Sequence, residues 1–210
     1  RALKAHIQAI AKGEADIILG TQLVAKGHNF PLLTLVGVID ADLGLQGSDL
    51  RAAERTFQLM RQVSGRAGRS DKPGEALLQT YQPEHPVIRS ILSGDETGFL
   101  QTEATQRRDA GVPPYGRLAG IILSGPDLSQ LFDLGNALAR QDQPLRQIDA
   151  QVFGPAPAPI ARVRGRHRVR LLVKAGKTTP LQPALTTWIG QFKLKAQMRL
   201  AVDIDPQSFY

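Results

Sequence analysis

The chain has 210 residues, of which 42% are hydrophobic and 21% charged, a balance typical of a globular protein with one large or two modest cores. It contains no cysteine, which excludes disulfides and thiolate metal sites within these residues and favours a cytoplasmic location. No apolar run has the length that spans a bilayer, so we expect no membrane contact.

Positive charge is concentrated in the second half of the chain. Residues 1–105 carry 11 Lys and Arg against 12 Asp and Glu, a net charge of −1, whereas residues 106–210 carry 15 against 7, a net charge of +8. Such an asymmetry predicts a surface for nucleic acid or another polyanion on the C-terminal half. A basic domain that is merely soluble is the alternative.

The first part of the chain, residues 1–84, is typical of an α/β fold, because short apolar runs alternate with helical patterns. We expect the apolar runs to form strands of a parallel sheet that is buried on both faces. The elements predicted in chain order are a helix over 1–12, a strand over 17–22, a strand over 32–39, a helix over 49–63 and a strand over 74–81.

Two carboxylates follow the strand predicted over 32–39. Asp40 and Asp42 could hold a metal ion, but the sequence offers no third ligand beside them. We expect them to close the strand and to orient a neighbour such as Arg51 or Arg66. His85 lies in a proline-bounded loop and is expected to make a loop hydrogen bond rather than act as a catalytic base.

Residues 62–69 place two arginines three positions apart behind a glutamine. The spacing puts Arg66 and Arg69 on one side of a helix or tight turn, and Gly65 lets a ligand approach the backbone closely. A guanidinium pair suits a phosphate group, and an arginine aimed at a γ-phosphate recurs in phosphoryl transfer. The alternative is an ordinary surface arginine pair at a helix end.

The remainder of the chain predicts a helical connector and a small α+β domain with its helices on one face. The connector, residues 85–114, ends in the rigid sequence Gly-Val-Pro-Pro. The elements predicted in chain order are helices over 86–92 and 96–110, a strand over 117–124, a helix over 128–141, a strand over 150–154, a proline turn over 155–159, two strands flanking Gly165, a helix over 180–195 and a strand over 198–205.

Arginine recurs at every second position in the most basic part of this domain, at Arg162, Arg164, Arg166, Arg168 and Arg170. A continuous strand would put all of them on one face, and a hairpin at Gly165 would still gather them at one edge. Phosphate is the expected partner, and a charged edge strand that discourages aggregation is the alternative. His167 is the one candidate for base stacking within the run, which argues against an aromatic platform for single strands.

Two segments resemble motifs of superfamily 2 helicases. Residues 20–31 resemble motif V, and residues 62–69 resemble motif VI. Together with residues 49–55 and the proline-rich residues 154–159, they make the chain similar over nearly its whole length to the PriA family of replication-restart helicases, also called primosomal protein N′. The resemblance implies part of a RecA-like second helicase lobe, followed by a small α+β C-terminal domain.

The resemblance also implies an activity, an ATP-dependent 3′-to-5′ DNA helicase that recognises stalled replication forks and restarts replication by primosome assembly. It implies nucleoid association, with single-strand-binding protein, primosome proteins and the replicative helicase loader as partners. The implied cofactors are ATP with Mg²⁺, and zinc in the family. The site residues that it indicates are Gln62, Arg66 and Arg69 as catalytic, and Thr21, Gly27 and Gly65 for ATP binding and coupling.

The chain lacks several motifs that this activity needs. It has no Gly-x-x-x-x-Gly-Lys-Ser/Thr loop to cradle phosphates, no Asp-Glu-x-His motif for the metal, and no cysteine for zinc. We therefore expect a C-terminal piece of a longer protein that does not hydrolyse ATP alone. Two alternatives are a non-enzymatic nucleic-acid-binding module on a helicase-like scaffold, and a domain whose arginines bind the acidic tail of single-strand-binding protein.

Overall fold

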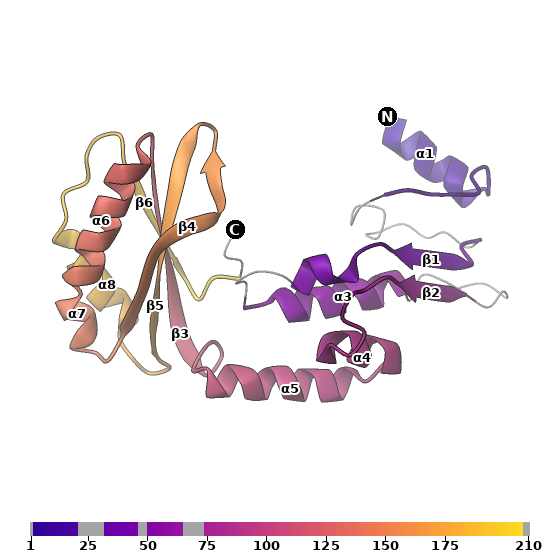
Figure 1. Ribbon diagram of the computed structural model, residues 1–210, viewed down its shortest axis with the longest axis horizontal. Coiled ribbons are helices and arrows are strands. Elements are labelled where there is room, and N and C mark those ends of the chain that lie inside the picture. Colours follow the sequence, from indigo (N-terminus) through magenta and orange to yellow (C-terminus); the bar gives the residue numbers. More distant parts are fainter. Residues whose placement is uncertain (1, 21–31, 46–49, 65–73, 208–210) are drawn as a thin grey trace. The chain divides into compact units, whose positions relative to one another are not determined.

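The computed structural model describes residues 2–20, 32–45, 50–64 and 74–207 (Figure 1). The chain separates into two compact units, residues 1–101 and residues 102–210, and the division falls inside the segment predicted as a connector. None of the helices in the described ranges is long and apolar enough to cross a membrane.

The first unit contains a small parallel sheet with helices around it. Strands β1 and β2 pair in parallel, with Leu35 opposite Glu75 and Val38 opposite Leu78, which confirms the predicted direction of pairing. The elements are α1 (Ala2–Ala11), β1 (Leu35–Val38), the 3-10 helix η1 (Ala41–Leu45), α3 (Ala52–Ser64), β2 (Glu75–Leu78), α4 (Pro86–Ser93) and α5 (Glu96–Asp109), the last of which continues into the second unit.

Two predictions for this sheet are wrong. Residues 17–20 are not a strand, and Ile17 and Leu19 are 82% and 92% exposed. The sheet is also not buried on both faces, because the residues of β1 and β2 alternate between exposed and half-buried. An apolar run becomes a strand only when another strand pairs with it, and the described part of this sheet consists of β1 and β2.

The core of the first unit lies between α3, α4 and the start of α5. Phe57 and Phe99 stack with their ring centroids 4.1 Å apart and an angle of 6° between the rings. Ile88 from α4 is buried against Met60 from α3. His85 caps the start of helix α4, because its Nδ1 accepts a hydrogen bond from the Val87 backbone N–H. The expected loop hydrogen bond of this histidine is therefore confirmed.

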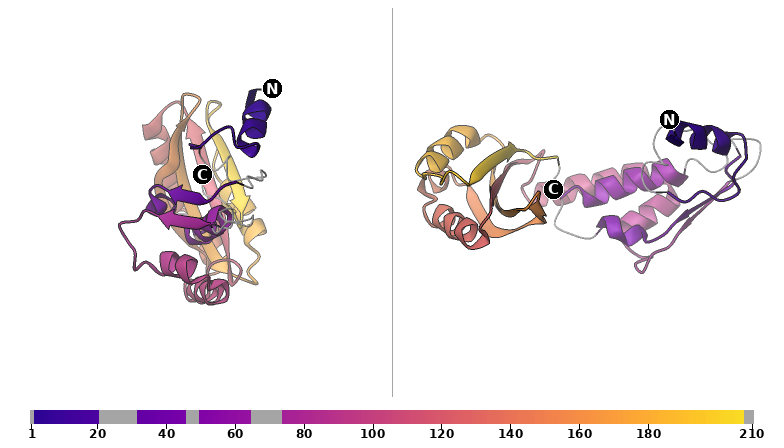
Figure 2. Two further views of the ribbon diagram at one scale, coloured as in Figure 1. Left: turned by 90° about the vertical axis from the view of Figure 1, so that its right-hand side faces the viewer. Right: turned by 90° about the horizontal axis from the view of Figure 1, so that it is seen from above.

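The second unit is a four-stranded antiparallel sheet in the order β4-β5-β3-β6. Helices α6, α7 and α8 lie on one side of this sheet, as predicted (Figures 1 and 2). The order of the elements and of the strands is that of a ferredoxin-like fold. The elements are β3 (Gly116–Gly125), α6 (Leu128–Arg140), α7 (Gln143–Arg146), β4 (Gln151–Val163), β5 (Arg166–Gly176), α8 (Leu181–Gly190) and β6 (Arg199–Ile204).

Alternation along β5 explains where the core of this unit lies. Val169, Leu171 and Val173 are fully or almost fully buried in the cluster beneath the helices, and the residues between them are half-buried on the opposite side. Trp188 of α8 is fully buried, and its Nε1–H donates to the Leu138 carbonyl oxygen of α6 at 3.1 Å. The two helices are therefore joined by a hydrogen bond within an apolar core.

Two further predictions differ from the structure. The predicted proline turn over 155–159 is part of β4, which runs from Gln151 to Val163 with two register shifts. Proline fits there because β4 is an edge strand, where a missing N–H need not break the ladder. Helix α8 ends at Gly190 instead of reaching residue 195.

Candidate nucleic-acid interface

The arginine run folds into the hairpin that joins β4 to β5. Val163 pairs with Arg166, which leaves Arg164 and Gly165 as the connecting loop. Both loop residues have left-handed backbones, with φ of 48° for Arg164 and 79° for Gly165. Two positive φ angles in a two-residue loop define a type I′ turn, whose twist matches that of the flanking strands. The predicted hairpin at Gly165 is therefore confirmed.

The hairpin distributes the arginines over three places. Arg166, Arg168 and Arg170 alternate with buried residues of β5, so they lie on the face of the sheet away from the helices, which we call the open face. Arg162 pairs with His167 and so shares the opposite face with it. Arg164 lies at the exposed tip of the hairpin.

Other cationic residues share the open face. In the register of the sheet, Arg168 pairs with Ser124 of β3, and Ser124 pairs with Arg199 of β6, so one row crosses the face between two arginines. Lys174 follows Arg170 on the same side of β5. Asp203 of β6 is an acidic residue on this face. Arg199 and Lys174 were not singled out from the sequence, because their position beside the arginine run depends on strand pairing.

Arg166 differs from its neighbours because its guanidinium holds the fold together. Its Nη2 donates to the carbonyl oxygens of Ser124 at 3.1 Å and Gln197 at 2.6 Å, which lie at the end of β3 and just before β6. Its Nε is buried and has no hydrogen-bond partner among the described residues. Arg166 therefore anchors the base of the hairpin, whereas Arg168 makes a 3.5 Å contact from Nη1 to the Ile160 carbonyl oxygen.

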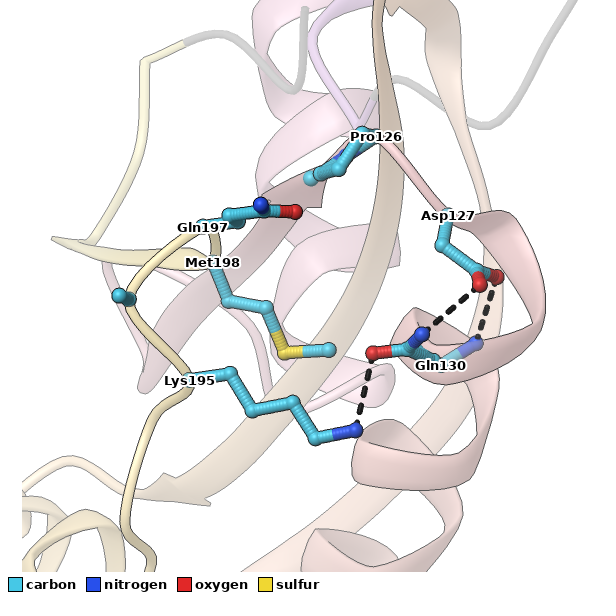
Figure 3. Close-up of a pocket in the computed structure, with 8 residues that line it drawn as sticks. Pro126, Asp127, Gln130, Lys195, Gln197 and Met198 are labelled. Atoms are coloured by element: carbon cyan, nitrogen blue, oxygen red, sulfur yellow. Dashed lines mark hydrogen bonds between the residues drawn. The ribbon is translucent and has the colours of Figure 1, made fainter.

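A pocket of about 260 Å³ lies beside the start of α6 (Figure 3). Asp127 caps α6 by accepting from the Gln130 backbone N–H at 3.1 Å, and this hydrogen bond is the main cause of the lowered pKa of Asp127. The Gln130 side chain donates to Asp127 and accepts from Lys195 Nζ at 2.9 Å. Figure 3 shows the Met198 side chain beside Lys195, with its end pointing toward Gln130. The polar groups of the pocket thus bond one another and hold the loop before β6 against α6.

Most residues predicted for the ATP site lie outside the described residues, namely Thr21, Gly27, Gly65, Arg66 and Arg69. Gln62 is described, and it is exposed near the end of α3. The roles of these residues therefore stay predictions.

Asp42 of η1 forms hydrogen bonds with the segment that follows β2. It is buried, and its carboxylate accepts hydrogen bonds from Thr80 Oγ1 at 2.5 Å and the Tyr81 backbone N–H at 2.7 Å. The hydrogen bond from Thr80 is the main cause of the lowered pKa of Asp42, and the hydrogen bond from Tyr81 lowers this pKa further. Asp40 accepts instead from the Leu43 N–H at the start of η1. Among the described residues, no three His, Cys, Asp or Glu residues form a group that could hold a metal ion.

Comparison with known proteins finds relatives of this chain among replication restart proteins. Residues 108–207 match the family model described as the primosomal protein N C-terminal domain. Over 197 residues the chain is 43% identical to the replication restart protein PriA of Rickettsia felis, an alignment that covers 94% of the chain and 30% of the relative. The chain therefore belongs to the PriA family.

Two more distant relatives extend this result to other bacteria. The chain is 37% identical to the replication restart protein PriA of Bacillus subtilis, over 95% of the chain and 25% of the relative. It is 35% identical to that of Haemophilus influenzae, over 98% of the chain and 28% of the relative. The chain thus spans less than a third of the length of these relatives.

Proposed function

We propose that the chain is the C-terminal part of an ATP-dependent DNA helicase that acts at stalled replication forks. Within it, the second unit holds the DNA backbone through the tip of the β4–β5 hairpin and the open face. Its membership of the PriA family supports the first statement. The observation that carries the second is the gathering of cationic side chains from β5 and β6 on one face.

The arginines of the run have two kinds of role in this proposal. Arg162 and Arg164, which are exposed at the hairpin tip, and Arg168 and Arg170, on the open face, contact phosphates. Such contacts release counterions and position the DNA without reading its sequence. Arg166 acts indirectly, because its two backbone hydrogen bonds fix the hairpin that presents the others.

The proposed motor function divides the ATP site between two lobes. Arg66 and Arg69 would contact the terminal phosphates, Gln62 would position them or a water, and Thr21 with Gly27 would couple the nucleotide to DNA. The phosphate loop that holds ATP with Mg²⁺ is not among these residues, so the chain alone is expected to hydrolyse no ATP.

The test of DNA binding is fluorescence anisotropy of the whole chain with a labelled fork and a labelled duplex across a salt series. We expect binding with a steep negative slope of log affinity against log salt. The double variant Arg168→Ala/Arg170→Ala should weaken binding and flatten the slope, whereas Arg140→Ala, on a helix at the other side of the sheet, should not. Failure of the chain to bind DNA at low salt would refute this assignment.

A second candidate is docking of an acidic peptide, such as the tail of single-strand-binding protein. It is favoured by the same cationic groups, because carboxylates and phosphates both accept from arginine. A labelled acidic peptide in the same assay separates the two candidates. Binding of the peptide without binding of DNA would assign the open face to protein docking.

A further inference from the structure

An aromatic side chain lies among the cationic residues of the open face. Phe153 of β4 pairs directly with Leu172 of β5, so the two side chains share a face. Leu172 lies between Arg170 and Lys174 along β5. Phe153 is 47% exposed, although a residue of this size is usually well buried. The structure therefore adds an exposed aromatic ring to a surface that the sequence indicated to be only basic.

The immediate surroundings of the ring are cationic. Lys174 Nζ lies 5.9 Å from the ring centroid of Phe153, within the range of a cation–π contact. The same Nζ donates to the Ala110 carbonyl oxygen at 3.4 Å, which holds the ammonium group beside the ring. Arg170 is diagonal to Phe153 across the strand pair, a separation that a long side chain can reach.

We propose that Phe153 stacks on an unpaired base of single-stranded nucleic acid whose phosphates contact Arg170 and Lys174. This inference rests on the proposed function, because it needs an open face that binds phosphates. A ring with cations beside it matches a nucleotide, which presents a flat base next to a charged phosphate. Bases within a duplex are already stacked on one another, so the ring discriminates in favour of single strands or of the unpaired part of a fork.

The contribution of the ring can be isolated with three labelled probes for the whole chain: an oligothymidylate, an abasic oligonucleotide of the same length, and a duplex. Phe153→Leu keeps an apolar side chain of similar bulk but has no aromatic face. We expect it to weaken binding of the oligothymidylate by about 5- to 150-fold, the range measured when a base-stacking aromatic is removed. Binding of the abasic strand and of the duplex should not change.

Two control variants test whether the loss of binding is specific to the aromatic ring at this position. Phe153→Tyr retains a stacking ring and should bind the oligothymidylate like the unaltered chain. Val202→Ala shortens another exposed apolar residue, 42% exposed, which pairs with buried Ile121 and so lies on the helix side of the sheet. It should leave binding of all three probes unchanged.

A spectroscopic variant gives a second readout. Phe153→Trp places a fluorophore at the site, and the native Trp188 is fully buried and provides a constant background. The added emission should be quenched by oligothymidylate and not by the abasic strand. Equal quenching by both strands, or an equal loss of affinity for both in Phe153→Leu, would overturn stacking while leaving phosphate binding in place. Absence of binding to every probe at low salt would instead overturn the proposed function.

Discussion

One substitution in the turn of the β4–β5 hairpin, at Arg164, is expected to raise the stability of the domain and to weaken its DNA binding. Arg164 occupies the first position of a type I′ turn, where its φ of 48° is unfavourable for a long side chain. Asparagine followed by glycine is the preferred pair in such turns. Arg164→Asn therefore replaces a poorly suited turn residue with a well suited one and removes one positive charge from the exposed tip.

The two effects have opposite signs. The left-handed conformation costs an ordinary residue about 1–2 kcal/mol, and asparagine should recover about 1 kcal/mol of this. For a domain of about 100 residues, that gain raises the melting temperature by roughly 4 °C. If Arg164 neutralises one phosphate, its loss should reduce the slope of log affinity against log salt by about 0.9.

Both quantities can be measured on the same sample. The chain has one tryptophan, Trp188, buried in the second unit, so its fluorescence during heating reports unfolding of that unit. Anisotropy of a labelled duplex across a salt series gives the slope. Arg164→Lys keeps the charge and the unfavourable backbone and should change neither quantity. A lower melting temperature for Arg164→Asn would refute the turn argument, and an unchanged slope would refute a phosphate contact by Arg164.

Two other changes test the roles of buried polar groups. Arg166→Ala removes two hydrogen bonds from a charged donor, each of which contributes about 1.5–3 kcal/mol, so it should destabilise the second unit by at least that amount while also weakening DNA binding. Arg168→Ala should weaken binding with little change in stability. Chemical denaturation followed by Trp188 fluorescence distinguishes them, and equal destabilisation by both variants would contradict the anchoring role. Asp42 has a folded-state pKa below its ordinary 3.8, so its stabilising effect is present above pH 3.8 and lost as pH falls through the folded-state pKa. The protection factor of the Tyr81 amide against hydrogen exchange should fall with this acid dependence in the unaltered chain but not in Asp42→Asn. An identical dependence of the protection factor on pH in both proteins would argue against the assignment.

Elements that depend on local signals were predicted well from the sequence. Helix α6, for example, was expected over 128–141 and spans Leu128–Arg140. Its start follows from Asp127, whose side chain caps the first turn. Helix capping and helical periodicity are properties of neighbouring residues, so the sequence contains them directly.

Elements that depend on pairing were predicted less well. The apolar run at 17–20 has the composition of a strand but is not one, and the prolines at 155–159 lie in a strand although they indicated a turn. The outcome for residues 17–20 depends on whether a neighbouring strand is present. The outcome for residues 155–159 depends on which edge of the strand the proline nitrogens face. Neither fact is encoded in the segment itself.

The candidate interface shows the same division. A period of two revealed the arginine run, because that pattern lies within one stretch of sequence. Phe153, Lys174 and Arg199 join it only through the register of β4, β5 and β6. The inference against an aromatic platform was based on residues 162–170 alone, and it did not include Phe153, which lies on the preceding part of the strand.

The prolines of β4 also determine how the sheet can associate with other chains. Pro155, Pro157 and Pro159 have no N–H to donate, so this stretch of the outer edge of β4 is a poor template for an added strand. At the opposite edge, β6 contains no proline. A protein that extends this sheet by strand addition would therefore do so beside β6, and copies of the domain crowded together are prevented from joining edge to edge through the proline stretch of β4.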